Sequence, residues 1–277
     1  MTLWTPAKGG AGDVTGLALG LPATGVETLR GVGLGFGLEA TKELDGVGLG
    51  IFGLGAGGSL RGIFAGGLGM GAGEDIDGIA VGGLGVGCGG SAHGILVAGL
   101  GAGCGEGLVG LTAAGLAVGA GGKIRGIALG GLAVGSGGGI DGIAGAALGV
   151  GSGGDVRGLA VAGLAVGSGG TIQGLAVAGL GIGAPRIQGV VASLAAGGQE
   201  VTGLVIAPAY FQVARDGRFT GASISAFNRI LGEQHGLAIG IVNYTPSLHG
   251  VQIGLINWAG NNPSGLKILP IVNAHLD

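Results

Sequence analysis

The chain has 277 residues, of which 76 are glycine, 47% are hydrophobic and 10% are charged, and its formal net charge is −3. The hydrophobic content excludes a disordered polar linker, because such segments have too little apolar surface to bury. The charge balance lacks the basic excess of a nucleic-acid binder, so no nucleic-acid partner is expected.

The first eight residues contain no basic segment followed by an apolar one. This pattern predicts no signal peptide, and we therefore expect a protein that is cytoplasmic or peripheral to a membrane, unless the chain is a mature form. Glycine, serine and charged residues interrupt every apolar run along the chain, so no membrane-spanning helix is predicted.

Eight consecutive units of 16 residues run from Gly46 to Gln173, and each opens with glycine and an aliphatic residue. One of them, from Gly126 to Asp141, reads GIALGGLAVGSGGGID. Less regular copies on both sides bring the total to about sixteen, and a fixed period predicts one structural unit copied along the chain. We expect a single repeat domain over 1–277, with regular repeats at 46–173, an irregular insertion or cap at 203–220 and further repeats at 221–277.

The glycine content excludes helices, since each interior glycine costs about 0.5–1 kcal/mol relative to alanine. Each unit has one strong turn signal, such as 135–139 with the sequence GSGGG. A second corner at Ala162-Gly163 is not kept in other units, where Gly240-Ile241 and Gly254-Leu255 stand in its place. One turn in each repeat favours an antiparallel arrangement with about one strand per 14–16 residues.

Side-chain direction also favours this arrangement. If 152–155 is a turn between two strands, Leu148 and Val150 share a face with Leu159 and Val161, and small residues gather at the far end. Such a gradient suits a tapered sheet whose edges close. The predicted fold is therefore an all-β, antiparallel up-and-down closed barrel, and the alternative is a parallel β-solenoid.

The last residue of successive units alternates in charge. In a barrel, the arginines at one end would bind an anionic headgroup through their planar guanidinium groups, and the candidate ligand-binding residues are Arg30, Arg61, Arg125 and Arg157. In a solenoid, the same residues would form a ladder of ion pairs worth about 0–1 kcal/mol each. A third interpretation is a solvated charge beside each turn. The series reads Arg30, Asp45, Arg61, Asp77, His93, Val109, Arg125, Asp141, Arg157, Gln173 and Gln188.

Cys88 and Cys104 are the only cysteines and are one repeat apart. They have no zinc-ligand spacing and are interpreted as small apolar residues. A solenoid would stack them at about 4.8 Å, whereas a barrel would place them at opposite ends of a strand. An efficient intramolecular bridge between them would therefore exclude the barrel.

The residues that could carry catalysis or bind metal form no recognisable motif. His93, His235, His249 and His275 do not supply a converging ligand set with supporting contacts, so no metal site is predicted. Glycine-rich strings are expected by chance at this composition, and Gly121-Gly-Lys123 lacks the serine or threonine of a phosphate-binding loop. We expect no enzymatic activity and no cofactor.

The least repetitive segment, 207–220, contains two further candidate ligand-binding residues, Tyr210 and Phe211. A segment that interrupts an array is often functional. The segment either binds a ligand or caps and joins two types of repeat, and both interpretations remain open.

The C-terminal segment from Gly221 to Asp277 resembles bacterial surface-repeat proteins with tandem GVQIGLIN units. The motif is found at Gly250–Asn257, and Gly236–Asn243 reads GLAIGIVN. This group is also similar to β-flower barrels, whose likeness to Tubby-type lipid-binding barrels implies a shallow barrel with an apolar interior and a lipid ligand. The resemblance implies no individual site residue.

These features predict a non-enzymatic protein that binds a lipid or another anionic amphiphile inside a barrel, with a lipid or membrane surface as its partner. The alternative is a structural or assembly protein without a small-molecule ligand, either a solenoid rod or a membrane-inserted barrel. The low aromatic content, 4%, argues against the membrane-inserted form. Under this alternative, we expect the chain to associate with copies of itself.

Overall fold

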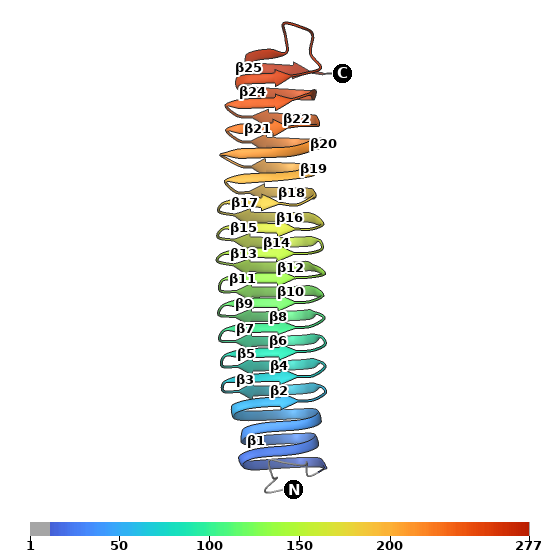
Figure 1. The fold of residues 1–277 in the computed structure, drawn as a ribbon, viewed down its shortest axis with the longest axis vertical. Helices are drawn as coiled ribbons and strands as arrows, with labels where there is room; N and C mark the ends of the chain where they lie inside the picture. The colour runs from blue at the N-terminus through green and yellow to red at the C-terminus, as the bar shows by residue number, and fades with distance from the viewer. Residues whose placement is uncertain (1–11, 277) are drawn as a thin grey trace. The chain divides into compact units, whose positions relative to one another are not determined.

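The computed structural model describes residues 12–276, and the chain divides into two compact units, Met1–Gly138 and Gly139–Asp277. Both units are parallel β-solenoids (Figure 1), and residues 12–276 form about 15 turns. The all-β prediction is confirmed, but the predicted closed antiparallel barrel is wrong and its alternative, the solenoid, is correct. The segment used to judge a signal peptide lies outside the described residues.

The first coils of unit 1 form one continuous strand, β1 (Asp13–Ala56). Each later coil of this unit contains a long and a short strand. The long strands that follow are β2 (Leu60–Gly66), β4 (Ile76–Gly82), β6 (Ala92–Ala98), β8 (Leu108–Ala114) and β10 (Lys123–Gly130). The short strands are β3 (Gly69–Ala72), β5 (Gly85–Cys88), β7 (Gly101–Cys104), β9 (Ala117–Ala120) and β11 (Ala133–Ser136).

Unit 2 continues this pattern, with some long and short strands fused. Its long strands are β12 (Gly139–Ala146), β14 (Val156–Ala162), β16 (Thr171–Ala178), β18 (Arg186–Ala192) and β22 (Glu233–Ile239). Its short strands are β13 (Gly149–Ser152), β15 (Ala165–Ser168), β17 (Gly181–Gly183), β21 (Phe227–Ile230) and β23 (Val242–Thr245). The fused strands are β19 (Ala195–Ile206), β20 (Tyr210–Ile224) and β24 (Ser247–Ala259), and the last strand is β25 (Ile268–His275).

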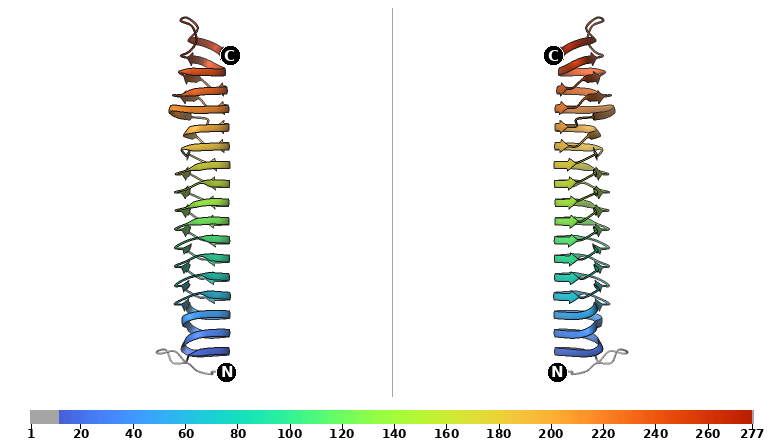
Figure 2. Two further views of the ribbon diagram at one scale, coloured as in Figure 1. Left: turned by 90° about the vertical axis from the view of Figure 1, so that its right-hand side faces the viewer. Right: turned by 90° about the vertical axis from the view of Figure 1, so that its left-hand side faces the viewer.

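Long strands pair in parallel with long strands, and short strands with short strands. The residues that pair are separated by one repeat length. In unit 1, Leu60 of β2 pairs with Ile76 of β4, so each residue stacks on its equivalent 16 positions later. In unit 2, Val156 of β14 pairs with Ile172 of β16 in the same way. Figure 2 shows the strands of each unit in two layers.

The glycine that opens each repeat bends the long strand and lies against the coil before it. Gly62 has a φ of +130°, and a Cβ on it would lie 1.9 Å from the carbonyl oxygen of Gly46. Both the positive φ and the close approach require a residue without a side chain. The invariant first position of the repeat is therefore a requirement of coil stacking.

The second corner of each coil is the feature that the barrel prediction missed. In unit 1 it falls at Gly67-Leu68, where a Cβ on Gly67 would lie 1.8 Å from the carbonyl oxygen of Ile51. In unit 2, Gly240-Ile241 forms the same corner between β22 and β23. In most coils the corner is a glycine followed by an aliphatic residue, and Ala147-Leu148 of unit 2 has alanine in the first position. The replacements that argued against a second turn therefore preserve it.

The face assignment behind the tapered barrel is wrong for the same reason. Val150 is 2% exposed and points into the core, whereas Leu148 and Val161 are 46% and 41% exposed. The corner at Ala147-Leu148 interrupts the strand, so the in-and-out alternation does not run through it.

The core of each unit consists of stacked rows of equivalent inward residues. In unit 1, Leu60 and Ile76 occupy one such row and are fully buried. In unit 2, a row that begins with Val166 and Ile182 passes through Ala196 and Phe211. It ends with Asn228, Asn243 and Asn257. The Nδ2 atom of Asn228 donates to Oδ1 of Asn243, and Nδ2 of Asn243 donates to Oδ1 of Asn257, each at 2.7 Å. This amide ladder pairs buried side-chain amides of neighbouring coils, and Oδ1 of Asn228 at its end has no hydrogen-bond partner.

Cys88 and Cys104 form a disulfide between neighbouring short strands of unit 1, with their Cα atoms 4.5 Å apart. They are register partners in β5 and β7. The bridge is the outcome that excludes the barrel, and it corrects the interpretation of both cysteines as merely small apolar residues.

The irregular segment in unit 2 remains part of the solenoid. β20 pairs with β19 through a register shift between Gly198 and Glu200, so the extra residues are accommodated as a bulge. β25 then pairs antiparallel with β24 at the C-terminal end of the described residues. The segment 203–220 therefore contributes coil positions with a local insertion.

Candidate functional site

The outward side chains of the long strands form a regular apolar surface, which we call the aliphatic face. It consists of the first and third residues after each opening glycine, together with the residue at the second corner. In unit 1, its exposed members are Val32, Leu34, Val47, Leu49, Ile63, Ile79, Val81, Ile95, Val97, Ile127 and Leu129, with Phe52, Leu68, Leu84, Leu100, Leu116 and Leu132 at the corner.

Unit 2 has an aliphatic face of the same design. Its exposed members are Ile143, Val161, Leu175, Val190, Ile206, Ile224 and Ile253, with Leu148, Leu164, Leu180, Leu194, Ile241 and Leu255 at the corner. Single exposed aliphatic residues are normal on protein surfaces, but a contiguous exposed apolar surface usually marks an interaction site. The face is therefore the strongest candidate for function.

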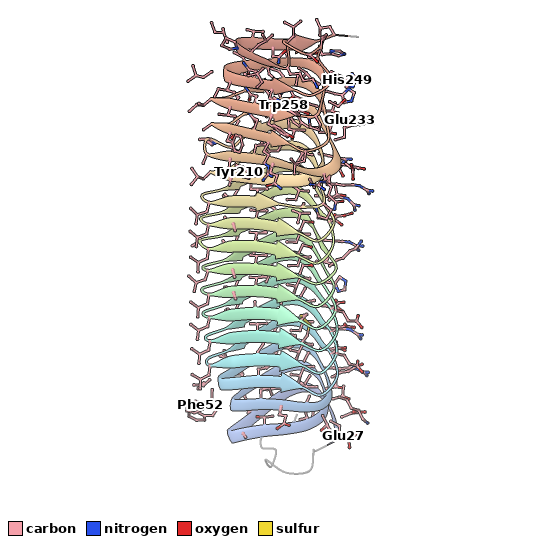
Figure 3. The ribbon with its side chains drawn as sticks, turned by 45° about the horizontal axis from the view of Figure 1, so that its top comes forward. Glu27, Phe52, Tyr210, Glu233, His249 and Trp258 are labelled. Carbon is pink, nitrogen blue, oxygen red and sulfur yellow. A yellow bond between two sulfur atoms is a disulfide. The ribbon has the colours of Figure 1, made fainter. Side chains whose placement is uncertain are left out.

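A charged row borders the aliphatic face on the side opposite the corner. In unit 1, Figure 3 shows carbon side chains along the edge that carries Phe52 and oxygen- and nitrogen-bearing side chains along the edge that carries Glu27. The row includes an ion pair between Nε of Arg61 and Oδ2 of Asp77 at 3.7 Å, and Nδ1 of His93 lies 3.2 Å from Oδ1 of the same aspartate. These side chains are about half exposed, so each pair contributes about 0–1 kcal/mol.

The outer side of the short strands from β3 to β17 carries almost no side chains, because its positions are glycine or alanine. In unit 2 this glycine face, which includes Gly167, Gly181 and Gly183, ends against Tyr210 and Gln212 and forms an open groove of about 600 Å³. The Tyr210 hydroxyl donates to Oε1 of Gln212 at 2.6 Å. The groove has a flat backbone floor and one polar, aromatic wall.

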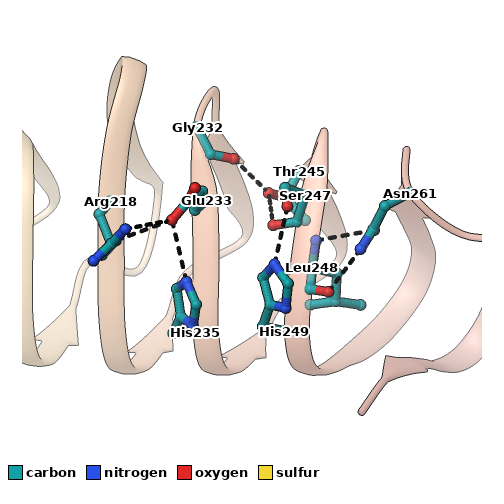
Figure 4. Close-up of polar contacts among 9 residues, drawn as sticks. All are labelled: Arg218, Gly232, Glu233, His235, Thr245, Ser247, Leu248, His249 and Asn261. Atoms are coloured by element: carbon teal, nitrogen blue, oxygen red, sulfur yellow. Dashed lines mark hydrogen bonds and ion pairs between the residues drawn. The ribbon is translucent and has the colours of Figure 1, made fainter. Parts of the chain in front are cut away.

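Polar side chains gather on the edge of unit 2 near the C-terminal coils (Figure 4). Nη2 of Arg218 lies 2.8 Å from Oε2 of Glu233, and Nε2 of His235 lies 3.3 Å from the same oxygen. The hydrogen bond with His235, followed by the hydrogen bond and charge of Arg218, lowers the pKa of Glu233. The rings of His235 and His249 stack with their centroids 4.6 Å apart.

The histidines do not assemble a metal site in the described part of the chain. Between residues 12 and 276, no group of three or more histidine, cysteine, aspartate or glutamate side chains is arranged to hold a metal ion. The same residues contain no helix that is long and apolar enough to cross a membrane.

The structure separates the residues predicted to bind a ligand. Arg30, Arg61 and Arg125 occupy the charged row of unit 1, and Arg157 has the equivalent place in unit 2. Nε of Arg30 lies 4.0 Å from Oδ2 of Asp45, and Nη2 of Arg157 lies 2.6 Å from Oδ2 of Asp155. The three arginines of unit 1 therefore lie in a ladder along its coils.

The two aromatic candidates point to opposite sides of one strand. Phe211 is fully buried and packs edge-on against Phe219, with their ring centroids 5.2 Å apart. Tyr210 lines the outer groove and contacts Phe227, at a centroid distance of 5.7 Å. Neither lies in the charged row with the arginines.

Sequence reasoning missed the aliphatic face, although a signal for it was present. Ile63 directly follows an opening glycine, and the register places it outside the coil. Once two corners per repeat are assumed, the same register identifies the whole face.

Comparison of the chain with protein families, with curated proteins and with solved structures found no match.

Proposed function

We propose that this protein is a structural or assembly protein that acts through the outer faces of its solenoid units and needs no small-molecule ligand. The observation that carries the proposal is the aliphatic face. Its members are exposed in successive coils of both units, for example Ile79 at 37% and Leu84 at 50% in unit 1. A surface of this kind is stabilised when another apolar surface covers it.

The packing of the coils supports this function over the binding of an amphiphile in an interior. The inward side chains of Leu60, Phe64 and Met70, all from one coil of unit 1, are at most 6% exposed. An acyl chain would have to displace them, and the close packing of protein interiors opposes that. The amphiphile site was expected in a barrel lumen, and the solenoid fills the corresponding space with its own side chains.

The proposal is tested on the full chain by light scattering and electron microscopy over a range of concentrations, with native mass spectrometry for bound molecules. We expect concentration-dependent assembly without any added ligand. A chain that stays monomeric throughout, or that carries a stoichiometric small molecule needed for its stability, would refute the proposal.

A further inference from the structure

We infer that the aliphatic face of unit 1 is an interface between two copies of this chain, which pack face to face with their coil stacks antiparallel. The inference rests on the proposed function and names the partner and its orientation. The arguments are the area of the face and the order of charges in the row beside it.

The aliphatic face of unit 1 is large enough to hold two copies of the chain together. The six coils from Arg30 to Val109 extend about 29 Å at the usual strand spacing of about 4.8 Å. From Arg61 across the face to Leu68, the chain covers about 23 Å at about 3.3 Å per residue. The footprint is about 660 Å² on each copy, or about 1,300 Å² for the pair, which lies within the range of specific protein interfaces.

The charged row selects the antiparallel orientation. A two-fold axis perpendicular to the coil stack keeps the charged row of one copy beside the charged row of the other, in reverse order. A two-fold axis along the stack would instead place it against the partner's row of corner leucines. Desolvating charges against apolar side chains without a partner is unfavourable, so the first arrangement is preferred.

The alternation of charges also specifies the register. With the axis midway between the coils of Arg61 and Asp77, Arg61 lies opposite the partner's Asp77, and Asp45 lies opposite the partner's His93. If the axis passed through the coil of Arg61 or of Asp77 instead, that residue would meet the same residue of the partner, which has a like charge. The intervening apolar positions then match, with Ile63 opposite the partner's Ile79.

A charge placed in the centre of the face tests the interface. Val81→Lys adds an ammonium group to an outward position that is 42% exposed, so the coil itself can accommodate it. We expect self-association to weaken on the order of 100-fold, measured by sedimentation velocity. Gly119→Lys is the matched control, because it adds the same charge on the glycine face of unit 1, where a Cβ meets nothing within 4 Å. The control should associate like the unmodified chain.

Orientation is tested by cross-linking two single-cysteine chains. Leu34→Cys and Ala113→Cys are each made in a chain that also carries Cys88→Ala and Cys104→Ala, whose self-association is verified first. In the antiparallel register these positions face each other across the axis. We expect oxidation of the mixture to give mainly the mixed pair, with few pairs of either variant alone.

The possible results separate this inference from the proposed function. Loss of assembly in Val81→Lys together with the mixed cross-link supports both. Assembly that survives Val81→Lys unchanged, or cross-links only between identical variants, overturns the inference and leaves an assembly protein. A full chain that never associates overturns both.

Discussion

The opening glycine of the repeat offers the sharpest test of the coil geometry. Gly126 in unit 1 has a φ of +114°, and a Cβ on it would lie 2.2 Å from the carbonyl oxygen of Gly110. Gly126→Ala should therefore cost about 1–3 kcal/mol for the backbone conformation. Moving the neighbouring strand away should cost about 1–3 kcal/mol more. We expect a total loss of about 2–6 kcal/mol in the coils around residue 126.

Gly119→Ala is the matched control, one strand earlier in the same unit. No heavy atom lies within 4 Å of its added Cβ and its φ is not positive, so we expect a gain of about 0.4–1 kcal/mol from the restricted unfolded chain. Repeat arrays can unfold segment by segment, so hydrogen exchange of the amides in β8 to β11 measures the change better than a single melting temperature. Equal protection in both variants would refute the stacking role of the opening glycine.

Three further predictions concern the amide ladder, the carboxylate of Glu233 and the disulfide. Asn243→Ala should destabilise the C-terminal coils by about 2–4 kcal/mol, measured by chemical denaturation, because it removes two hydrogen bonds of the ladder and one to the carbonyl oxygen of Ile253, and leaves Oδ1 of Asn257 without its donor. The pKa of Glu233 lies below its ordinary value of 4.5 because of His235 and Arg218, so its stabilising contribution is present above that value and is lost as the pH falls through the lowered pKa. Glu233→Gln should show a smaller decrease in melting temperature than the unmodified chain between about pH 6 and pH 3, and identical curves would contradict this assignment. Reduction of the bridge between Cys88 and Cys104, whose sequence separation is 16, should cost about 3 kcal/mol in calorimetry, while a chain with both cysteines replaced by alanine should not respond to reductant.

The sequence predicted the repeat period and the strand content because both depend on local chemistry. Glycine at a quarter of positions rules out helices, and the exact recurrence from Gly46 to Gln173 requires one structural unit per copy. The charge alternation was also interpreted correctly in its solenoid form, since Arg61 and Asp77 pair in unit 1. These conclusions needed no knowledge of how neighbouring units pair.

The direction of strand pairing could not be predicted because the second corner has a weak signature. A turn such as 137–138 contains two glycines, but the corner at 131–132 reads Gly-Leu and looks like part of a strand. Its conformation depends on the coil beneath it, since a Cβ on Gly131 would lie 1.8 Å from the carbonyl oxygen of Gly115. Contacts between residues 16 positions apart therefore decide the fold, and local turn propensity does not contain that information.

The candidate site could be predicted only in part, for the same reason. Arg61 and Arg125 were recognised as members of one row, but their neighbours in that row depend on whether strands are parallel. Tyr210 and Phe211 are adjacent in sequence and alternate between the outside and the core, which no composition argument resolves. The aliphatic face becomes recognisable only after register assigns each row to the inside or the outside.

The inward and outward rows have different roles, and this difference indicates that the aliphatic face is not simply a by-product of folding. Stacking within a unit is accounted for by the inward rows, the opening glycines and the backbone pairing between coils. An outward position tolerates polar residues, as Arg61 and Asp77 demonstrate two residues before Ile63 and Ile79. An exposed apolar row on a β-sheet also carries a risk of aggregation, which proteins usually reduce with charged residues. Aliphatic residues in successive coils at two such positions are therefore best explained by a surface that covers them, and the bordering charges limit which surfaces can do so.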